Sequence, residues 1–551
     1  MAKPGDRASL RHAEAIRALL AGEFGLAEER FRQAVALRPD FAHAHNDLGL
    51  LLVAQGRRGE AIPHHVAAIR LAPERALFWF NFGAALNEVR LAKADPGFRA
   101  DLLRALTEPG CDARHLVAPV LTLAENDLGE AGFADPDRLA AHPLLMALLA
   151  RILIADRKAE DRLTALRRLL LERRRAGQEV PRDLALALSR QAYYGEYAWA
   201  VAAEEEALLA GLDAADPIGA AYRPSASVPE LAGLMVDEPA QERRLAAELA
   251  ALTPIEDAVS QAVRAQYETH PYPRWINLPR PDKARPLAEH LGLLFPGRAW
   301  PTPAARPLQV LIAGAGTGLQ SILAALRYAD CQVLGIDLSR ASLAYAERQR
   351  RRLGVDNLAH AQADILRLRD LGRRFHLIEC YGVLHHMADP LAGLAVLADI
   401  LDPNGYMLLG LYSERARQDI VAGRAFIARQ GFAPTDDGIR QARQAIRAQD
   451  PQSPLGRLVT SVDFYSLSLC RDLLFHVQEH RLTLPAIAAM LDQTGLEFLG
   501  FDLADPAAHK AYRARFPADR LMASLGNWAA FEADNPGTFA STYRFWVRKP
   551  G

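Results

Sequence analysis

The chain contains 551 residues, and its 65 Lys and Arg nearly balance its 66 Asp and Glu, which leaves a formal net charge of −1. This length is too great for a single hydrophobic core and predicts about two to four domains. The balanced charge argues against nucleic acid or anionic lipid as a partner. The four cysteines form no C-x-x-C pair and so indicate neither a disulfide scaffold nor a cysteine zinc site.

The N-terminal residues lead into an amphipathic pattern rather than the apolar core of a signal peptide. The most apolar helical stretch, residues 143–155, is interrupted by Arg151 and is too short to span a bilayer. We therefore expect a soluble, cytoplasmic protein that does not enter a membrane.

Residues 1–105 contain a repeat with a spacing of 34, in which Gly22 recurs as Gly56 and Pro39 as Pro73. Small residues at these positions let paired helices approach closely, and the proline ends the second helix of each pair. The spacing resembles that of tetratricopeptide (TPR) repeats, helix–turn–helix units that stack into a solenoid. The resemblance implies a concave face suited to a protein or peptide partner. The alternative is that the repeats serve as a scaffold or in dimerisation.

Residues 106–255 keep apolar side chains at three- and four-residue spacing but show no clean repeat. We interpret them as a helical middle region without chemistry of its own. Residues 256–300 form a connector rich in aromatic residues and proline.

The connector contains the run Gln-Tyr-Glu-Thr-His-Pro-Tyr-Pro-Arg-Trp at residues 266–275, whose two prolines exclude a continuous helix. It resembles a Y-x-x-x-P-Y-P-R-W segment of bacterial proteins that join TPR-like repeats to a methyltransferase domain. We expect Tyr267 and Tyr272 to act at a catalytic site, where Tyr272 and Trp275 form a lid that caps the cofactor or lines the substrate channel. The alternative is an ordered linker whose aromatic side chains seal a seam between domains.

A buried strand at residues 310–313 runs into the glycine turn Gly314-Ala315-Gly316-Thr317-Gly318, and a second strand, residues 331–336, stops at Asp337. A glycine turn lets the backbone approach a ligand closely, and a carboxylate at the tip of the next strand can accept hydrogen bonds from both ribose hydroxyls. The pattern predicts a nucleoside-binding crevice at the carboxyl edge of a parallel sheet.

A dinucleotide site would need a small residue where the chain has Leu319. The pattern G-x-G-x-G instead resembles motif I of the class I S-adenosylmethionine (SAM) methyltransferases. Ala363-Asp364-Ile365, the strand and loop at residues 375–386, and Leu401-Asp402-Pro403-Asn404-Gly405-Tyr406 resemble three further motifs of this family, in the same order. One departure is Ala313, where many members carry an acidic residue that contacts the methionine amino group.

The resemblance implies that residues 301–551 form a Rossmann-like α/β methyltransferase domain with a seven-stranded, mostly parallel sheet and SAM as cofactor. It places the fifth, sixth and seventh strands at residues 407–411, 496–503 and 542–548. The cofactor-binding residues that it implies are Gly314, Gly316, Gly318, Asp337, Leu338, Asp364, Ile365 and Tyr381.

A helical insertion at about residues 412–490 follows the fifth strand, at a point where insertions usually shape the acceptor pocket. The loop after the fourth strand carries His385 and His386. We take His386 as the catalytic base or acceptor-orienting residue and expect His385 to turn toward the sheet or cofactor. Equally, neither histidine need do chemistry, because such loops occur in many members of the family.

The sequence argues against some subclasses of SAM methyltransferase. No Asp/Asn-Pro-Pro-Tyr/Phe run follows the fourth strand, so amino methylation of adenine, cytosine or glutamine in that style is unsupported. The arginine-rich run at residues 348–352 ends a predicted helix, where cations complement the helix dipole, so it is weak support for RNA. His64 and His65 are adjacent and lie on different helix faces, so we expect no metal site there.

The sequence thus predicts a SAM-dependent methyltransferase whose TPR-like repeats recruit a protein or peptide acceptor. Two alternatives remain open. One is a small-molecule or glycan methyltransferase whose repeats serve assembly, and the other is a non-catalytic TPR adaptor that binds SAM as a structural ligand or sensor.

Overall fold

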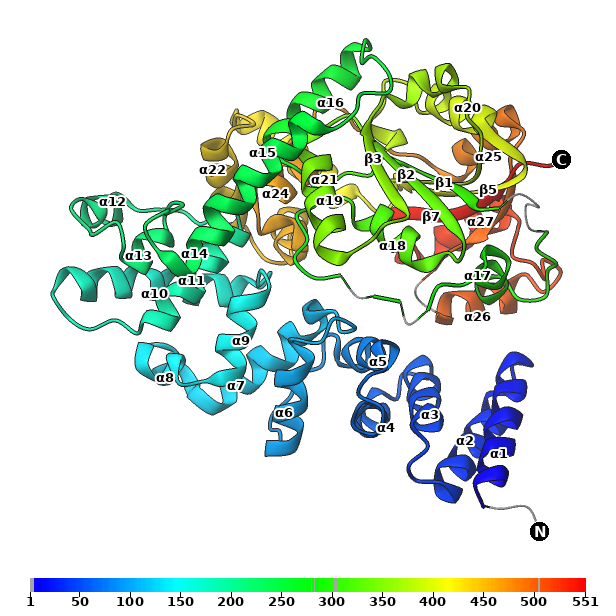
Figure 1. The fold of residues 1–551 in the computed structure, drawn as a ribbon, viewed down its shortest axis with the longest axis horizontal. Helices are drawn as coiled ribbons and strands as arrows, with labels where there is room; N and C mark the ends of the chain where they lie inside the picture. The colour runs from blue at the N-terminus through cyan, green and yellow to red at the C-terminus, as the bar shows by residue number, and fades with distance from the viewer. Residues whose placement is uncertain (1–3, 279, 282, 302–305, 504–505) are drawn as a thin grey trace. The chain divides into compact units, whose positions relative to one another are not determined.

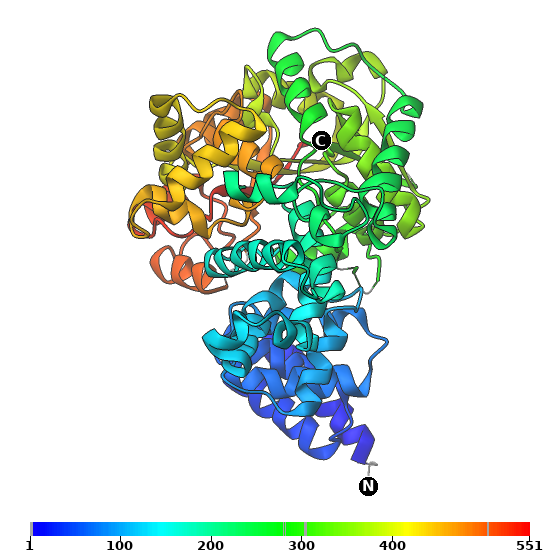
Figure 2. The ribbon, with the colours of Figure 1, turned by 90° about the vertical axis from the view of Figure 1, so that its left-hand side faces the viewer.

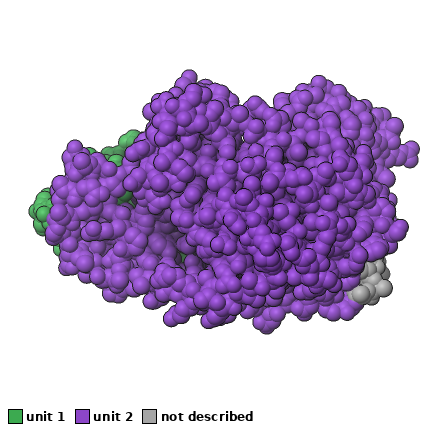
Figure 3. All heavy atoms as spheres, turned by 90° about the horizontal axis from the view of Figure 1, so that it is seen from above, with its two compact units in different colours: residues 1–154, 162–191, 276–282 green, residues 155–161, 192–275, 283–551 purple. Residues whose placement is uncertain are grey.

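The structure is a computed structural model that describes residues 4–278, 280–281, 283–301, 306–503 and 506–551. The chain forms two compact units, which Figure 3 distinguishes by colour. Unit 1 comprises residues 1–154, 162–191 and 276–282, and unit 2 comprises residues 155–161, 192–275 and 283–551. The boundaries of these units fall within the predicted helical middle region, residues 106–255, and the predicted connector, residues 256–300.

All the described elements before the first strand are helical. In chain order they are α1 (Pro4–Leu20), α2 (Phe24–Leu37), α3 (Ala42–Ala54), α4 (Arg58–Leu71), α5 (Ala76–Leu86), α6 (Pro96–Ala105), η1 (Ala113–Leu116), α7 (Val117–Phe133), α8 (Pro136–Ala140), α9 (Pro143–Arg151), α10 (Arg157–Arg175), α11 (Arg182–Tyr194), α12 (Ala203–Leu209), α13 (Pro217–Ala220), α14 (Pro229–Ala232), η2 (Gly233–Asp237), α15 (Glu238–Glu248), α16 (Ala258–Thr269) and α17 (Leu287–Leu294).

In unit 1, successive helices pack in pairs, α1 on α2 and α3 on α4, and α4 packs in turn on α5 (Figures 1 and 2). The repeat of 34 residues is visible in side-chain contacts. His45 Nε2 donates a hydrogen bond to the carbonyl of Pro39 at 3.0 Å, and Trp79 Nε1 donates one to the carbonyl of Pro73 at 2.9 Å. Trp79 lies 34 residues after His45, and Pro73 lies 34 residues after Pro39, so the same contact recurs at equivalent positions of consecutive repeats.

Unit 2 contains a seven-stranded sheet of order β3-β2-β1-β4-β5-β7-β6, in which β7 runs antiparallel to its neighbours β5 and β6. The sequence-based prediction of a seven-stranded, mostly parallel sheet is confirmed. The strands are β1 (Leu308–Ala313), β2 (Cys331–Asp337), β3 (Leu358–Gln362), β4 (Phe375–Tyr381), β5 (Leu401–Tyr412), β6 (Glu497–Phe501) and β7 (Thr542–Arg548).

The helical elements that follow β1 include those that connect the strands and those of the insertion. They are α18 (Leu319–Arg327), α19 (Arg340–Leu353), η3 (Ile365–Leu371), η4 (Leu384–His386), α20 (Pro390–Ile400), α21 (Gln418–Gln430), α22 (Asp436–Arg447), α23 (Pro454–Arg457), η5 (Leu458–Thr460), η6 (Val462–Phe464), α24 (Leu467–Phe475), α25 (Leu484–Thr494), α26 (Pro506–Arg515) and α27 (Leu525–Asp534).

Helices α18 and α19 pack on β2 and β3, whereas α20 packs on β5 and α25 on β6. The strands are apolar and buried along most of their length because helices cover the sheet. A continuous core of side chains from β4, β5, α20 and α25 fixes the sheet, with Ile378, Leu409, Leu397 and Ile487 all fully buried. This rigid core holds the carboxyl ends of β1, β2 and β4 in place beside one another.

The strand β5 differs from its predicted extent, residues 407–411, because it begins at Leu401. Leu401 pairs with Phe375 and Tyr406 with Leu377, so the predicted turn lies inside the strand as a bulge opposite one residue of β4. Strand β6 is shorter than predicted, at Glu497–Phe501, and β7 has the predicted bounds.

Residues 413–483, between β5 and α25, form helices and turns within unit 2, apart from an isolated β-bridge between Ser413 and Leu482. The sequence placed a helical insertion at about residues 412–490. In the described part of the chain, no helix combines the length and the apolar character needed to cross a membrane.

Candidate active site

A cavity of about 420 Å³ lies at the carboxyl ends of β1, β2 and β4, within unit 2. Its walls come from the glycine turn after β1, the tip of β2, the residues after β3, the loop after β4, the helical insertion and residues 267–273. Parallel α/β sheets bind ligands at this edge, because loops from neighbouring strands diverge there. The cavity has two halves, which differ in their chemistry.

The nucleoside half is bounded by the glycine turn. Gly314 and Gly316 line the cavity with φ angles of 84° and 51°. A Cβ atom on Gly316 would stand 2.8 Å from the carbonyl oxygen of Tyr272. Gly318 does not line the cavity. It precedes α18, and a Cβ there would stand 2.5 Å from that of Ala346, so Gly318 serves helix packing rather than direct ligand contact.

Asp337 lies at the tip of β2 and lines the cavity beside Leu338. Its Oδ2 accepts a hydrogen bond from the backbone N–H of Gly316 at 2.8 Å, and its Oδ1 accepts one from that of Ser339 at 2.9 Å. Burial raises the pKa of this carboxyl above its usual value, although the backbone hydrogen bonds oppose the shift. Each oxygen keeps a further lone pair, so the carboxylate can still accept two hydrogen bonds from a ligand.

Asp364 and Ile365 follow β3 and also line the cavity. The Oδ1 of Asp364 accepts a hydrogen bond from the N–H of Leu366 at 3.0 Å and thereby caps η3. Burial raises the pKa of Asp364 as well. The nucleoside half therefore presents two carboxylates, and both have capacity left to accept hydrogen bonds from a ligand.

The other half of the cavity, which we call the acceptor half, is lined by aromatic and acidic side chains. Tyr267, Tyr272, Tyr381 and Tyr412 all face this cavity. The ring of Tyr381 fits over Gly410 of β5, where a Cβ would stand 2.1 Å from a ring carbon. A side chain at position 410 would therefore displace one of the four tyrosines.

The helical insertion contributes two carboxylates, Asp463 and Asp472. Tyr267 donates a hydrogen bond from its hydroxyl to Oδ1 of Asp472 at 2.5 Å, and His476 Nε2 donates one to the Tyr267 oxygen at 3.1 Å. The N–H of Gln478 donates to His476 Nδ1 at 3.1 Å, which fixes the proton of the neutral imidazole on Nε2. A chain of hydrogen bonds thus ends on Asp472.

Both insertion carboxyls hold their protons more strongly than exposed ones. Burial raises the pKa of Asp472 to about 7, although the Tyr267 hydroxyl lowers it. Burial likewise raises the pKa of Asp463 to about 6. Among the residues that the structure describes, none donates a hydrogen bond to the Asp463 carboxylate, so this group is open to the cavity.

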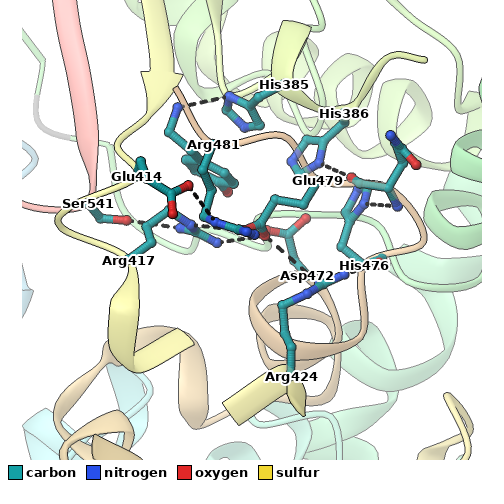
Figure 4. Close-up of polar contacts among 12 residues, drawn as sticks. His385, His386, Glu414, Arg417, Arg424, Asp472, His476, Glu479, Arg481 and Ser541 are labelled. Carbon is teal, nitrogen blue, oxygen red and sulfur yellow. Dashed lines mark hydrogen bonds and ion pairs between the residues drawn. The ribbon is translucent and has the colours of Figure 1, made fainter. Parts of the chain in front are cut away.

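Arg417 is the only Lys or Arg among the described residues that line the cavity. Its guanidinium packs 3.4 Å from the centre of the Tyr412 ring and pairs with Glu479 at 3.0 Å. Figure 4 shows Arg417 and Arg481 directed at Glu479, whose side chain is 1% exposed. The single negative charge of Glu479 is therefore shared by Arg417, Arg481 and Arg424, which lies 3.9 Å from it.

His386, the residue expected to act as base, lines the cavity. Its Nδ1 donates a hydrogen bond to the Gln478 carbonyl at 2.7 Å, which leaves the lone pair on Nε2 (Figure 4). Burial lowers its pKa to about 4, so His386 is neutral at physiological pH and a weak proton acceptor. His385 is fully buried, stacks on Tyr412 at 3.6 Å and does not line the cavity, in keeping with the expected turn toward the sheet.

His386, Asp472 and His476 offer ligand atoms that lie within 4.8 Å of one another. The two imidazoles are stacked, with ring centres 3.6 Å apart and planes at 20°. Lone pairs in the planes of stacked rings do not converge on one ion, and both nitrogens of His476 are already hydrogen-bonded. The donor geometry therefore favours hydrogen bonding over metal ligation at this trio.

The aromatic side chains of residues 266–275 differ in whether they line the cavity. Tyr267 and Tyr272 line the cavity, as expected. Trp275 is 7% exposed and lies outside the cavity, and its Nε1 donates a hydrogen bond to the carbonyl of Thr317 in the glycine turn at 2.9 Å. Tyr345 donates from its hydroxyl to the carbonyl of Trp275. Trp275 thus anchors the segment to the glycine turn, whereas only Tyr272 occupies the expected lid position.

No role was predicted from the sequence for Asp463, Asp472 or Arg417. The signal for Asp472 is local, because it is one of only two charged residues in the otherwise apolar helix α24. A charged residue inside an apolar helix needs a partner or a function. No comparable local signal marks Asp463, because its position at the cavity depends on how the insertion packs.

Parts of the chain are similar to known proteins. Residues 311–407 match the family model for a methyltransferase domain. A curated relative, an uncharacterised protein from Synechococcus sp., is 30% identical over 277 residues, which cover 49% of this chain and 64% of the relative. The chain therefore matches slightly less than two thirds of that relative's length.

Among solved structures, PKMT2 from Rickettsia typhi is 16% identical, with a TM-score of 0.37 over 47% of this chain and 51% of that chain. Phosphoethanolamine N-methyltransferase 2 from Haemonchus contortus, solved with SAM, is 15% identical, with a TM-score of 0.27 over 53% of this chain and 57% of that chain. The stretch that matches the methyltransferase-domain model, residues 311–407, contains the glycine turn, Asp337 and Asp364.

The residues of the nucleoside half fit SAM as the cofactor. The cavity volume lies within the range of about 300–1,000 Å³ typical of small-molecule sites. Asp337 would hold the ribose hydroxyls, and Asp364 the adenine amino group, through their remaining lone pairs. Gly314 and Gly316 place no side chain in the way of the cofactor.

Proposed function

We propose that this protein is a SAM-dependent methyltransferase that acts on a protein or peptide acceptor recruited by the helical repeats of unit 1. The observation that carries the proposal is the continuity of one cavity in which the nucleoside half adjoins an acceptor half with its own polar groups. A domain that bound SAM only as a sensor would have no need of the second half.

SAM, when bound, supplies a methyl group on a positively charged sulfur. The chain's task is to hold an acceptor atom in line with that methyl group, and proximity alone lowers the barrier by several kcal/mol. Tyr272 and Tyr381 stand on the walls between which the acceptor would lie. Because the cavity is enclosed by side chains from the sheet, the connector and the insertion, it limits the access of water.

Protein recruitment is supported by the first helices of the repeats in unit 1. His12 on α1 bonds to Asp47 on α3 at 2.8 Å, and Asn46 on α3 accepts from Asn81 on α5 at 2.8 Å. These contacts join equivalent helices of consecutive repeats side by side. A row of such helices presents a continuous surface, which suits an extended peptide.

The proposal is tested by incubating the full-length protein with tritiated SAM and host lysate, followed by separation of the protein and small-molecule fractions. We expect label in the protein fraction, dependent on an intact Asp337. Label confined to small molecules would replace the protein acceptor with a small-molecule or glycan acceptor. SAM binding without label in either fraction would favour the adaptor.

A further inference from the structure

The acceptor half of the cavity has an unbalanced charge. Taken over both halves, the cavity is lined by one guanidinium, that of Arg417, and by four carboxylates, those of Asp337, Asp364, Asp463 and Asp472. Arg417 pairs with Glu479, and although its charge lowers the pKa of both Asp463 and Asp472, burial outweighs this effect and no cation forms an ion pair with either carboxylate among the described residues. A buried carboxylate without a positive partner is costly, and a ligand cation removes this cost.

The walls around these carboxylates suit an organic cation. Tyr412 has Arg417 and His385 at 3.4 Å and 3.6 Å from its ring centre, so its faces are already covered. Tyr267 and Tyr272, whose ring centres are 6.4 Å apart, line the same space together with Tyr381. Tyrosine rings attract ammonium groups through their negative faces, and a desolvated site strengthens that attraction.

We propose that the acceptor atom is an amine nitrogen that enters this half as an alkylammonium, with Asp463 and Asp472 as its counter-ions and Asp472 as its proton acceptor. This inference rests on the proposed function and specifies the substrate class of the same site. A carboxylate acceptor would be repelled by both residues. An alcohol would leave them without positive charge.

The side chains of the cavity provide for each proton and electron pair in the transfer. The ammonium N–H proton passes to the Asp472 carboxylate, and the freed nitrogen lone pair forms the new N–C bond. The methyl C–S bond breaks, its electron pair stays on sulfur, and the products are a methylated ammonium and S-adenosylhomocysteine. The Asp472 proton then returns to solvent before the next turnover.

Asp472 suits proton transfer better than its neighbour His386. Burial raises the pKa of Asp472 to about 7 and lowers that of His386 to about 4, so the carboxylate is the stronger base. The hydroxyl of Tyr267, bonded to Asp472, stabilises its ionised form. His386, with its Nδ1 proton held by the Gln478 carbonyl, is left to orient the acceptor through Nε2.

A competing explanation is that Asp463 and Asp472 bind the ammonium of SAM itself. The two explanations differ in which ligand loses affinity when a carboxylate is neutralised. We therefore test the full-length protein saturated with S-adenosylhomocysteine, with n-butylamine as the cationic probe and n-butanol as its neutral counterpart, by calorimetry at pH 7.5. The variants are Asp463→Asn and, as a matched control, Asp437→Asn, whose side chain is 86% exposed.

We expect n-butylamine to bind at least about tenfold more tightly than n-butanol, and Asp463→Asn to remove this preference while S-adenosylhomocysteine affinity stays within about twofold. Asp437→Asn should behave as the unaltered protein. Equal binding of the two probes, or an unchanged preference in Asp463→Asn, would overturn the inference. A parallel loss of S-adenosylhomocysteine affinity would also overturn it, because the carboxylate would then serve the cofactor.

The labelled product separates this inference from the proposed function. Label on an amine nitrogen in the protein fraction supports both. Label on a small-molecule amine keeps the inference and refutes the protein acceptor. If base treatment releases the label of the protein fraction as methanol, the product is a methyl ester. That outcome supports a protein acceptor and refutes the amine acceptor.

Discussion

Tyr267 and Asp472 are 205 residues apart in the chain and are joined by a hydrogen bond of 2.5 Å from the tyrosine hydroxyl to the carboxylate. This contact ties the segment that precedes the sheet to helix α24 of the insertion. Burial raises the pKa of Asp472, and the hydrogen bond opposes it by stabilising the ionised form. The connector therefore sets the proton affinity of a group on the insertion.

Replacing Tyr267 by Phe should shift the pH dependence of activity. Loss of the hydroxyl destabilises ionised Asp472 and raises its pKa further above about 7. A hydrogen bond to a charged group contributes about 1.5 kcal/mol or more, equivalent to roughly one pH unit. If activity requires ionised Asp472, half-maximal kcat/KM should move to higher pH by about one unit. Tyr381→Phe, which removes a cavity hydroxyl not bonded to Asp472, should leave that midpoint in place, and an acid shift in Tyr267→Phe would contradict the assignment.

Replacing Asp472 by Asn should change stability in a pH-dependent way. The folded-state pKa, about 7, exceeds the unfolded value of about 3.9, so the folded protein binds more protons in between. The stabilisation of the folded state by protonated Asp472 is fully present below about pH 4 and is lost as the pH rises through about 7. The loss is at most about 4 kcal/mol.

At pH 8, Asp472→Asn should therefore have a thermal midpoint several degrees above that of the unaltered protein, and at pH 5 this advantage should shrink. Thermal unfolding at the two pH values measures the difference. The exposed Asp437→Asn variant should show none. An advantage of equal size at both pH values would mean that ionisation of Asp472 is not its cause.

Replacing Asp337 by Ala should weaken cofactor binding. A charged hydrogen bond to a ribose diol is worth about 1.5–3 kcal/mol, and about 1.4 kcal/mol corresponds to a factor of ten. Calorimetry with S-adenosylhomocysteine should show at least about a tenfold loss of affinity. Asp356→Ala, on an exposed residue between α19 and β3, is the matched control. Unchanged affinity in a folded Asp337→Ala protein would refute the cofactor site.

Tyr272 and Trp275 should respond in opposite ways to replacement by Ala. Tyr272 lines the cavity, so its loss should lower kcat/KM by about one to two orders of magnitude, or roughly 1.4–2.7 kcal/mol of barrier, with little change in the thermal midpoint. Trp275 is buried against the glycine turn, so its loss should cost about 3–5 kcal/mol of stability while the folded fraction retains activity. Measuring both quantities on each variant tests the distinction, which fails if Tyr272→Ala loses stability but not rate.

Charges placed on the first helices of the repeats should weaken acceptor binding. Leu50 on α3 and Phe80 on α5 are 42% and 38% exposed, so Asp at these positions should not unfold the chain. We expect a higher KM for a protein acceptor and unchanged S-adenosylhomocysteine affinity, because only remote binding energy is lost. Leu71→Asp and Leu37→Asp, on α4 and α2 with matching exposures of 42% and 38%, are the controls. If both pairs of variants keep the original KM, the repeats do not recruit the acceptor through this face.

Much of the nucleoside half can be predicted from the sequence. Asp337 lies at the tip of β2, and Gly316 turns toward it with a positive φ. These positions follow from local rules, namely the length of an apolar strand, the conformations open only to glycine and the polar residue that ends a strand. The bulge within β5 was not predicted in the same way, because its place in the strand depends on pairing with β4.

The acceptor half and the anchoring of the connector on the glycine turn were decided by tertiary structure. Tyr267 meets Asp472 across 205 residues, and Trp275 meets the carbonyl of Thr317 across 42. Each pair lies far outside the window in which residue spacing carries information. The pKa values of Asp472 and His386 follow from burial, which is a property of the packed molecule and not of the residues themselves. The sequence by itself determined the sheet and the nucleoside turn, because these depend on local backbone preferences, and only packing brought the acid, its tyrosine donor and the aromatic walls to one cavity.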